Sequence, residues 1–130
     1  MTPIINLPFH GSWNEEKNIR DIAYVFGIEG WYQGYVGFEK SPDYKFVVNT
    51  KLLDFEPGKT YHVEVGNIGN VLFLAVDGTL AFEIRDPDPI DFEKYGRIGF
   101  EAFCTRVKYK NLKIKRLIAV EDFELYTPEF

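Results

Sequence analysis

The chain has 130 residues, a length that fits one domain, and we expect a single domain over residues 1–130. Its net charge of −5 repels nucleic acid, and no apolar stretch approaches the length of a membrane span. We therefore expect neither nucleic acid nor a membrane as partner. The aromatic share of 17% favours strands, because aromatic rings suit a pleated, half-buried surface.

Cys104 is the only cysteine, so no intrachain disulfide is expected, and its apolar neighbours indicate a small buried hydrophobe. The opening "MTPIINLPFHG" is too short, too rich in proline and too weakly charged to be a signal peptide. These features leave the cellular compartment open.

Turn signals recur at short spacing with β-branched and aromatic runs between them, which predicts an all-β fold. The first clear strand covers residues 21–28, and both of its faces are apolar, so it should be central and covered on both sides. Next comes "YQGYVGFE", where Gly34 and Gly37 indicate a bulge or the close approach of another group. Residues 45–50 form the following strand.

Residues 61–65 alternate cleanly, which predicts a strand with His62 and Glu64 facing away from the core. After the turn "GNIGN", the stretch "NVLFLAVDGTLAFEI" predicts a hairpin. Asp77-Gly78 at its tip suits a type I′ turn, which needs positive φ at both positions. The apolar residues that should oppose each other are Leu72, Leu74 and Val76 on one strand, and Leu80, Phe82 and Ile84 on the other.

Two more strands are expected after the proline-rich loop "RDPDPIDFEKYG". The first is "GRIGFEAF", with Ile98, Phe100 and Ala102 inward. The second, "RVKYKNLKIKRL", changes phase at Lys110-Asn111, which predicts a β-bulge there. Residues 118–130 read either as a further strand or as a tail.

The ordered set of elements over residues 57–117 resembles the concanavalin A-like lectin/glucanase superfamily. The matching pieces are "YHVEV" at 61–65, "VDG" at 76–78, "GRIGF" at 96–100 and "YKNLKI" at 109–114. The nearest variants are laminin-G-like modules and bacterial domains of the 3-keto-disaccharide hydrolase type.

This resemblance implies an antiparallel jelly-roll β-sandwich, a carbohydrate ligand, and an extracellular or periplasmic location. Such domains are usually longer. We therefore expect a sandwich truncated at its N-terminus, a piece of a longer chain, or one completed by a partner domain or a homo-oligomer. The favoured function is a carbohydrate-binding module. The alternatives are an enzyme of the 3-keto-disaccharide hydrolase type and a structural or assembly β-sandwich without a small ligand.

Catalytic signatures are missing from the sequence. Glucanases of this superfamily carry E-x-D-x-E or E-x-D-x-x-E on one strand, and this chain has neither, although a catalytic pair need not be local in sequence. Zinc is disfavoured because His10 and His62 lie far apart and no metal-binding spacing occurs. A G-x-S-x-G motif is absent as well. We expect no cofactor and assign no catalytic residue.

Calcium is the one metal left open. "DPDPID" offers three hard oxygen ligands at Asp86, Asp88 and Asp91. A solvated acidic turn explains the same letters, and no full ligand set can be read from them.

A glycan site needs exposed aromatic rings beside groups that hydrogen-bond hydroxyls. "GIEGWYQGY" supplies Trp31, Tyr32, Gln33 and Tyr35 between glycines, and Trp13 is a second candidate. Outward-facing polar residues could line the same groove, and the ones we select are His62, Glu64 and Glu101. The alternative is that the tryptophans plug an edge of the sandwich and that these polar residues are merely solvated.

The last predicted strand carries a basic stripe that could bind an anionic glycan. Lysines alternating along a strand more often solubilise a face or protect a sheet edge, so we favour that reading. The stripe consists of Arg106, Lys108, Lys110, Lys113, Lys115 and Arg116.

Overall fold

The computed structural model describes residues 4–29, 33–43, 45–103 and 105–117. Every regular element in this part of the chain is a strand. The strands are β1 (Ile4–Phe9), β2 (Trp13–Asn14), β3 (Ile19–Arg20), β4 (Ala23–Ile28), β5 (Tyr35–Ser41), β6 (Lys45–Lys51), β7 (Val63–Ile68), β8 (Val71–Val76), β9 (Thr79–Arg85) and β10 (Glu101–Phe103). No helix among the described residues has the length and apolar character of a membrane span.

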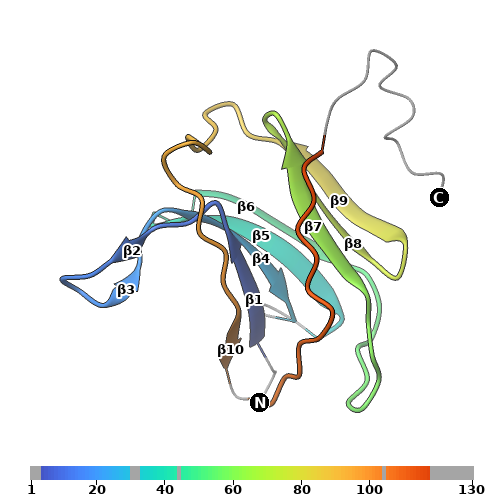
Figure 1. Cartoon of the computed structure of the whole chain (residues 1–130). Helices are drawn as coiled ribbons and strands as arrows, with labels where there is room; N and C mark the ends of the chain where they lie inside the picture. Colours follow the sequence, from blue (N-terminus) through green and yellow to red (C-terminus); the bar gives the residue numbers. More distant parts are fainter. Residues whose placement is uncertain (1–3, 30–32, 44, 104, 118–130) are drawn as a thin grey trace.

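Two antiparallel sheets face each other, as Figure 1 shows. The larger has the strand order β10-β1-β4-β5-β6, and the smaller has the order β7-β8-β9. The short ribbon β2-β3 projects from the side of the larger sheet. The predicted all-β, sandwich-like class is therefore confirmed, while jelly-roll connectivity stays a prediction.

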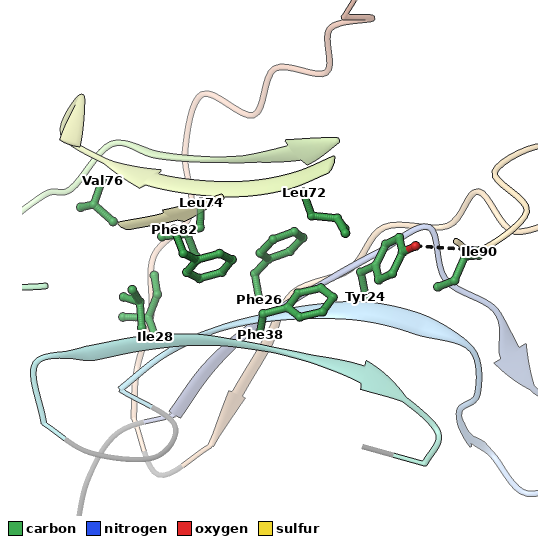
Figure 2. Packing of buried hydrophobic residues seen from close by; sticks show 10 residues of the cluster. Tyr24, Phe26, Ile28, Phe38, Leu72, Leu74, Val76, Phe82 and Ile90 are labelled. Atoms are coloured by element: carbon green, nitrogen blue, oxygen red, sulfur yellow. Dashed lines mark hydrogen bonds between the residues drawn. The ribbon is translucent and has the colours of Figure 1, made fainter. Parts of the chain in front are cut away.

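The core lies between the two sheets (Figure 2). Tyr24, Phe26 and Phe38 project from the larger sheet, and Leu72 and Phe82 project from the hairpin of the smaller one; all five are buried. The rings of Phe26 and Phe82 stack across the interface with centroids 6.2 Å apart. Aromatic pairs at this spacing add to the free energy gained by burial, so this cluster holds the layers together.

The elements with clear period-two patterns are where the sequence predicts them. All residues of β4 are buried, as expected for a central strand covered on both faces. In β7, Val63 and Val65 pack against the core. Asp77 and Gly78 have φ values of 49° and 81°, which confirms the positive φ required by the turn. Two details differ: β7 begins at Val63 and continues to Ile68, into the predicted turn, and the β8–β9 register shifts after Leu74.

The predictions for the two C-terminal strands are largely wrong. Only Glu101–Phe103 of "GRIGFEAF" forms a strand, and Ile98 and Phe100 are exposed instead of inward. β10 forms one edge of the five-stranded sheet, and Ala102 on this strand is exposed as well. Residues 105–117 form no strand, because no described strand pairs with them. At the predicted bulge, Asn111 adopts a φ of 57°.

Candidate functional site

The outer face of the five-stranded sheet, the face turned away from the core, carries a polar row. Alternation along each strand sends the neighbours of Phe26 and Phe38 to this side. The strand register then aligns one residue from each strand across the whole sheet: Glu101, Asn6, Gly27, Gly37 and Asn49. Two paired glycines thus form the middle of the row, with amide and carboxylate side chains on either side.

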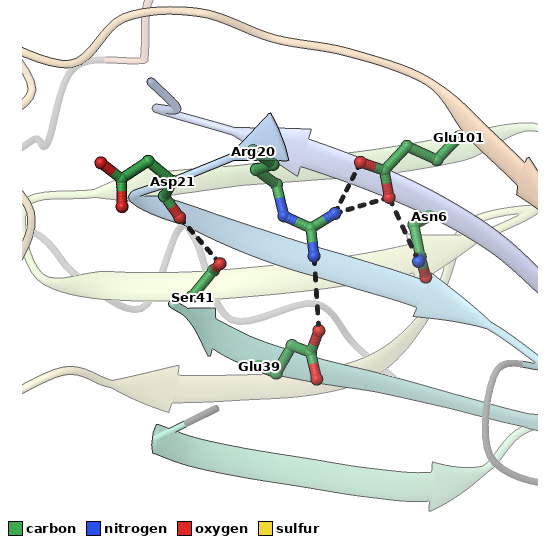
Figure 3. A network of polar contacts seen from close by, with 6 residues as sticks. All are labelled: Asn6, Arg20, Asp21, Glu39, Ser41 and Glu101. Atoms are coloured by element: carbon green, nitrogen blue, oxygen red, sulfur yellow. Dashed lines mark hydrogen bonds and ion pairs between the residues drawn. The ribbon is translucent and has the colours of Figure 1, made fainter. Parts of the chain in front are cut away.

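Arg20 reaches over this face and joins two carboxylates that are distant in the sequence (Figure 3). Its Nη1 donates to both carboxylate oxygens of Glu101, at 2.6 and 2.5 Å. Its Nη2 lies 3.8 Å from Oε1 of Glu39 on β5. Asn6 Nδ2 also donates to Glu101, at 3.4 Å. A guanidinium with two branches is well suited to hold such a pair in a fixed arrangement.

The three charges of this network are only partly solvated. Exposed fractions of the side chains are 18% for Arg20, 15% for Glu39 and 38% for Glu101. Burial raises the pKa of Glu39; the positive charge of Arg20 opposes this rise, and the negative charge of Glu101 adds to it. Arg20 Nε is buried without a hydrogen-bond partner in the structure. The network therefore combines two carboxylates, one cation and an amide at a sheet face.

Trp13 stands beside this network because of hairpin pairing. It is the cross-strand partner of Arg20 in the β2–β3 ribbon, and directly opposed residues share one face of such a ribbon. Trp13 is 42% exposed. The base of the ribbon is fixed by Ser12, whose backbone N–H donates to Ile22 O at 2.8 Å and whose Oγ accepts from Ile22 N at 3.1 Å. An exposed indole is thus paired with Arg20 on a ribbon that is anchored at its base.

The residues selected from "GWYQGY" have mixed outcomes. Trp31 and Tyr32 lie outside the described residues. Gln33 is exposed in the turn that precedes β5, and Tyr35, the first residue of β5, is half-buried. Alternation along β5 puts Tyr35 on the same face as Glu39. Part of the predicted patch therefore shares the outer face with the polar row.

His62 and Glu64 do not join Glu101. Glu64 lies on the outward side of β7, in the other sheet, and His62 directly precedes that strand. His62 Nε2 and Glu64 Oε1 are 3.0 Å apart, and both side chains are well exposed. Glu101 faces outward from the opposite sheet, with the core between them. The expectation that these three line one groove is wrong, since outward faces of two packed sheets point in opposite directions.

Two of the three calcium candidates have carboxylates that are engaged by protein donors. Asp86 is only 2% exposed, and its carboxylate accepts from Tyr24 Oη at 2.8 Å and contacts Lys40 Nζ at 2.9 Å. Asp91 Oδ1 accepts the backbone N–H of Glu93 at 3.0 Å, as a turn-capping carboxylate does. Asp88 is exposed. Within the described ranges, no group of three or more His, Cys, Asp or Glu is arranged to hold a metal.

Sequence reasoning selected Glu101 but missed Asn6, Arg20 and Glu39. Arg20 and Glu101 are 81 positions apart, and no local pattern encodes such a contact. The available signal was the pair Gly27 and Gly37, because glycines inside two strands mark a place where the sheet face has no side chains.

No family model, curated protein or solved structure matches the chain. The resemblance noted from the sequence therefore stays a prediction, and any functional proposal has to rest on the site itself.

Proposed function

We propose that the protein is a carbohydrate-binding module whose glycan site is the outer face of the five-stranded sheet. The observation that carries this proposal is the pairing of Trp13 with Arg20 across the β2–β3 ribbon. It pairs an exposed ring with Arg20, the residue that contacts two carboxylates.

This combination suits a sugar for physical reasons. An indole presents a flat apolar surface to the C–H face of a pyranose and still has a polar N–H. Carboxylates and amides accept and donate the hydrogen bonds that hydroxyls need. Binding sites generally combine an apolar surface with a few fixed polar groups, and Arg20 fixes Glu101 and Glu39 here.

The test is glycan-array binding by the wild-type protein and by Trp13→Ala. Ile19→Ala is the matched control, because Ile19 is 52% exposed on the same ribbon but is not the partner of Arg20. We expect Trp13→Ala to reduce binding at least tenfold, about 1.4 kcal/mol, and Ile19→Ala to leave it unchanged. Trp31→Ala tests the patch proposed from the sequence in the same assay.

The results separate the alternatives. Binding that survives Trp13→Ala but not Trp31→Ala would move the site to the "GWYQGY" stretch. Binding that survives both would refute both sites. An absence of binding to any glycan would favour the structural or assembly role.

One observation also favours an enzyme as the second candidate. Burial raises the pKa of Glu39, and both Glu39 and Glu101 contact Arg20. Glycosidases generally use two carboxyl groups in different environments to break a glycosidic bond. A screen of disaccharides and their 3-keto forms tests this candidate. Turnover that is abolished in Glu39→Gln but retained in Glu64→Gln, on the other sheet, would support it.

A further inference from the structure

Residues 106–117 are a strand-like segment that no described strand pairs with. Figure 1 shows this segment as a drawn-out trace beside β7. Leu117 Cδ1 comes within 3.7 Å of the place where a Cβ on Gly66 of β7 would lie, and the rings of Tyr109 and Phe100 are 4.5 Å apart. No hydrogen bond joins these residues to the rest of the described chain. Among the described residues, their backbone donors and acceptors therefore have no hydrogen-bond partner.

The side chains of the segment are unusually apolar for such exposure. Leu112 is 60% exposed, Ile114 is 72% exposed and Leu117 is 42% exposed. Ile98 and Phe100, which precede β10, are exposed as well. Single exposed apolar residues are ordinary, but several on one segment whose backbone has no described partner are typical of an interaction surface.

All charges of the segment have one sign. It holds six cations, Arg106, Lys108, Lys110, Lys113, Lys115 and Arg116, and no acidic residue, in a chain whose net charge is −5. Two copies of the segment paired with each other would set like charges opposite one another, which is destabilising in a sheet. The charge therefore disfavours self-pairing and favours an acidic partner.

We propose that residues 106–117 bind an extended acidic strand of another protein by β-strand addition. Main-chain hydrogen bonds to the unpaired backbone would supply affinity, and alternate side chains would supply selectivity. Partner carboxylates meet Lys113 and Lys115, and partner apolar side chains cover Leu112 and Ile114. A nucleic acid or sulfated glycan would satisfy the cations but leave these apolar side chains exposed. A lipid surface would leave the backbone groups unpaired in an apolar medium.

The test uses labelled synthetic peptides and the full chain, with affinity read from fluorescence anisotropy. The main probe alternates valine and glutamate over eight residues. Three matched probes change one feature each. A peptide that alternates valine and lysine inverts the charge, and a peptide that alternates serine and glutamate removes the apolar face. N-methylation of alternate residues in the valine–glutamate peptide removes backbone donors. We expect the valine–glutamate peptide to bind at least tenfold more tightly than each of the other three.

Protein variants test the same contacts from the other side. The double variant Lys113→Glu/Lys115→Glu should reverse the preference toward the valine–lysine peptide. Ile114→Ser should weaken binding of the valine–glutamate peptide. Thr79→Ser, on the exposed edge of β9, is the control and should change nothing. All these positions are exposed, so circular dichroism should show an unchanged fold.

Hydrogen exchange decides between this proposal and its rivals. In the free protein the amides of residues 106–117 should exchange rapidly, and the valine–glutamate peptide should protect them. Protection already present without peptide would mean that the segment pairs with the protein's own β7, and the proposal would be wrong. Equal binding of the N-methylated peptide would rule out strand addition. Tighter binding of heparin or RNA than of the peptide would identify the segment as a polyanion site instead.

Discussion

Replacing Tyr24 with phenylalanine should destabilise the fold by about 3 kcal/mol. The ring is fully buried, and its hydroxyl group donates to Asp86 at 2.8 Å. The same hydroxyl group accepts from the backbone N–H of Ile90 at 3.0 Å (Figure 2). Losing a hydrogen bond to a charged group costs about 1.5–3 kcal/mol, and leaving a buried N–H unpaired costs about 1–3 kcal/mol. The total stays below the sum of these two because Lys40 still holds Asp86.

Urea unfolding at pH 7 measures this change, with Tyr61→Phe as the matched control. The hydroxyl group of Tyr61 also accepts a backbone N–H, from Glu56 at 2.7 Å, but this contact is exposed, so its loss should cost less than about 1 kcal/mol. A Tyr24→Phe cost no larger than that of the control would refute the reasoning. It would mean that water replaces the hydroxyl group in this buried site.

The pH dependence gives a second check on the same hydroxyl group. Burial alone would raise the pKa of Asp86, but hydrogen bonds from Lys40, the Asp88 backbone N–H and Tyr24 outweigh burial and lower the pKa. A carboxyl with a lowered folded pKa contributes stability above about pH 4 that is lost as the pH falls through the folded pKa. Tyr24→Phe removes one of these donors. Its cost should therefore be smaller near pH 2 than at pH 7.

Three further predictions concern the fold. Burial lowers the pKa of His10, and hydrogen bonds from its ring to Asn67 and to the Tyr95 backbone oppose this shift, so the neutral ring is favoured in the folded state. The melting temperature should therefore fall between pH 7 and pH 5, and His10→Gln should flatten this dependence. Gly78→Ala should lower the free energy of unfolding in urea by about 1 kcal/mol because φ is 81°, a conformation that alanine disfavours. Steric contact adds nothing to this cost, since a Cβ would meet no atom within 4 Å. Gly96→Ala, equally open but without positive φ, should cost nothing; equal effects would contradict the turn assignment. Leu72→Ala, at a fully buried position, should cost about 3 kcal/mol, whereas Ile114→Ala, at 72% exposure, should cost less than about 0.5 kcal/mol. Chemical denaturation of both variants checks this contrast.

The sequence predicted those parts of the fold whose determinants are local. In β7 and in the β8–β9 hairpin, alternation and a turn with positive φ at Asp77 and Gly78 specify strand, face and connection together. The first strand escaped prediction because Pro8 interrupts its pattern. Proline is tolerated there because β10 pairs only with Ile4–Asn6, and beyond it Pro8 only has to accept a hydrogen bond, from Gly99 N at 3.0 Å.

The candidate site was mostly beyond the reach of local pattern. Glu101 was selected as an outward polar residue, but its partner Arg20 comes from a ribbon far away in sequence. Asp86 was read as a solvated turn residue or a metal ligand. Its burial depends on Lys40 and Tyr24, which the fold delivers from β5 and β4. Whether a carboxylate is exposed, paired or free to bind is decided by neighbours in space.

Residues 106–117 show the same limit for secondary structure. Alternation at Leu112, Lys113, Ile114 and Lys115 satisfies the side-chain requirement of a strand, but a strand also needs a partner for its backbone groups. The described part of the chain supplies no such partner, so the pattern is present without the pairing. A strand pattern with exposed apolar side chains and an unpaired backbone is therefore informative in itself. Among the described residues, it marks the backbone groups that have no partner, and these are the groups that we propose a second molecule binds.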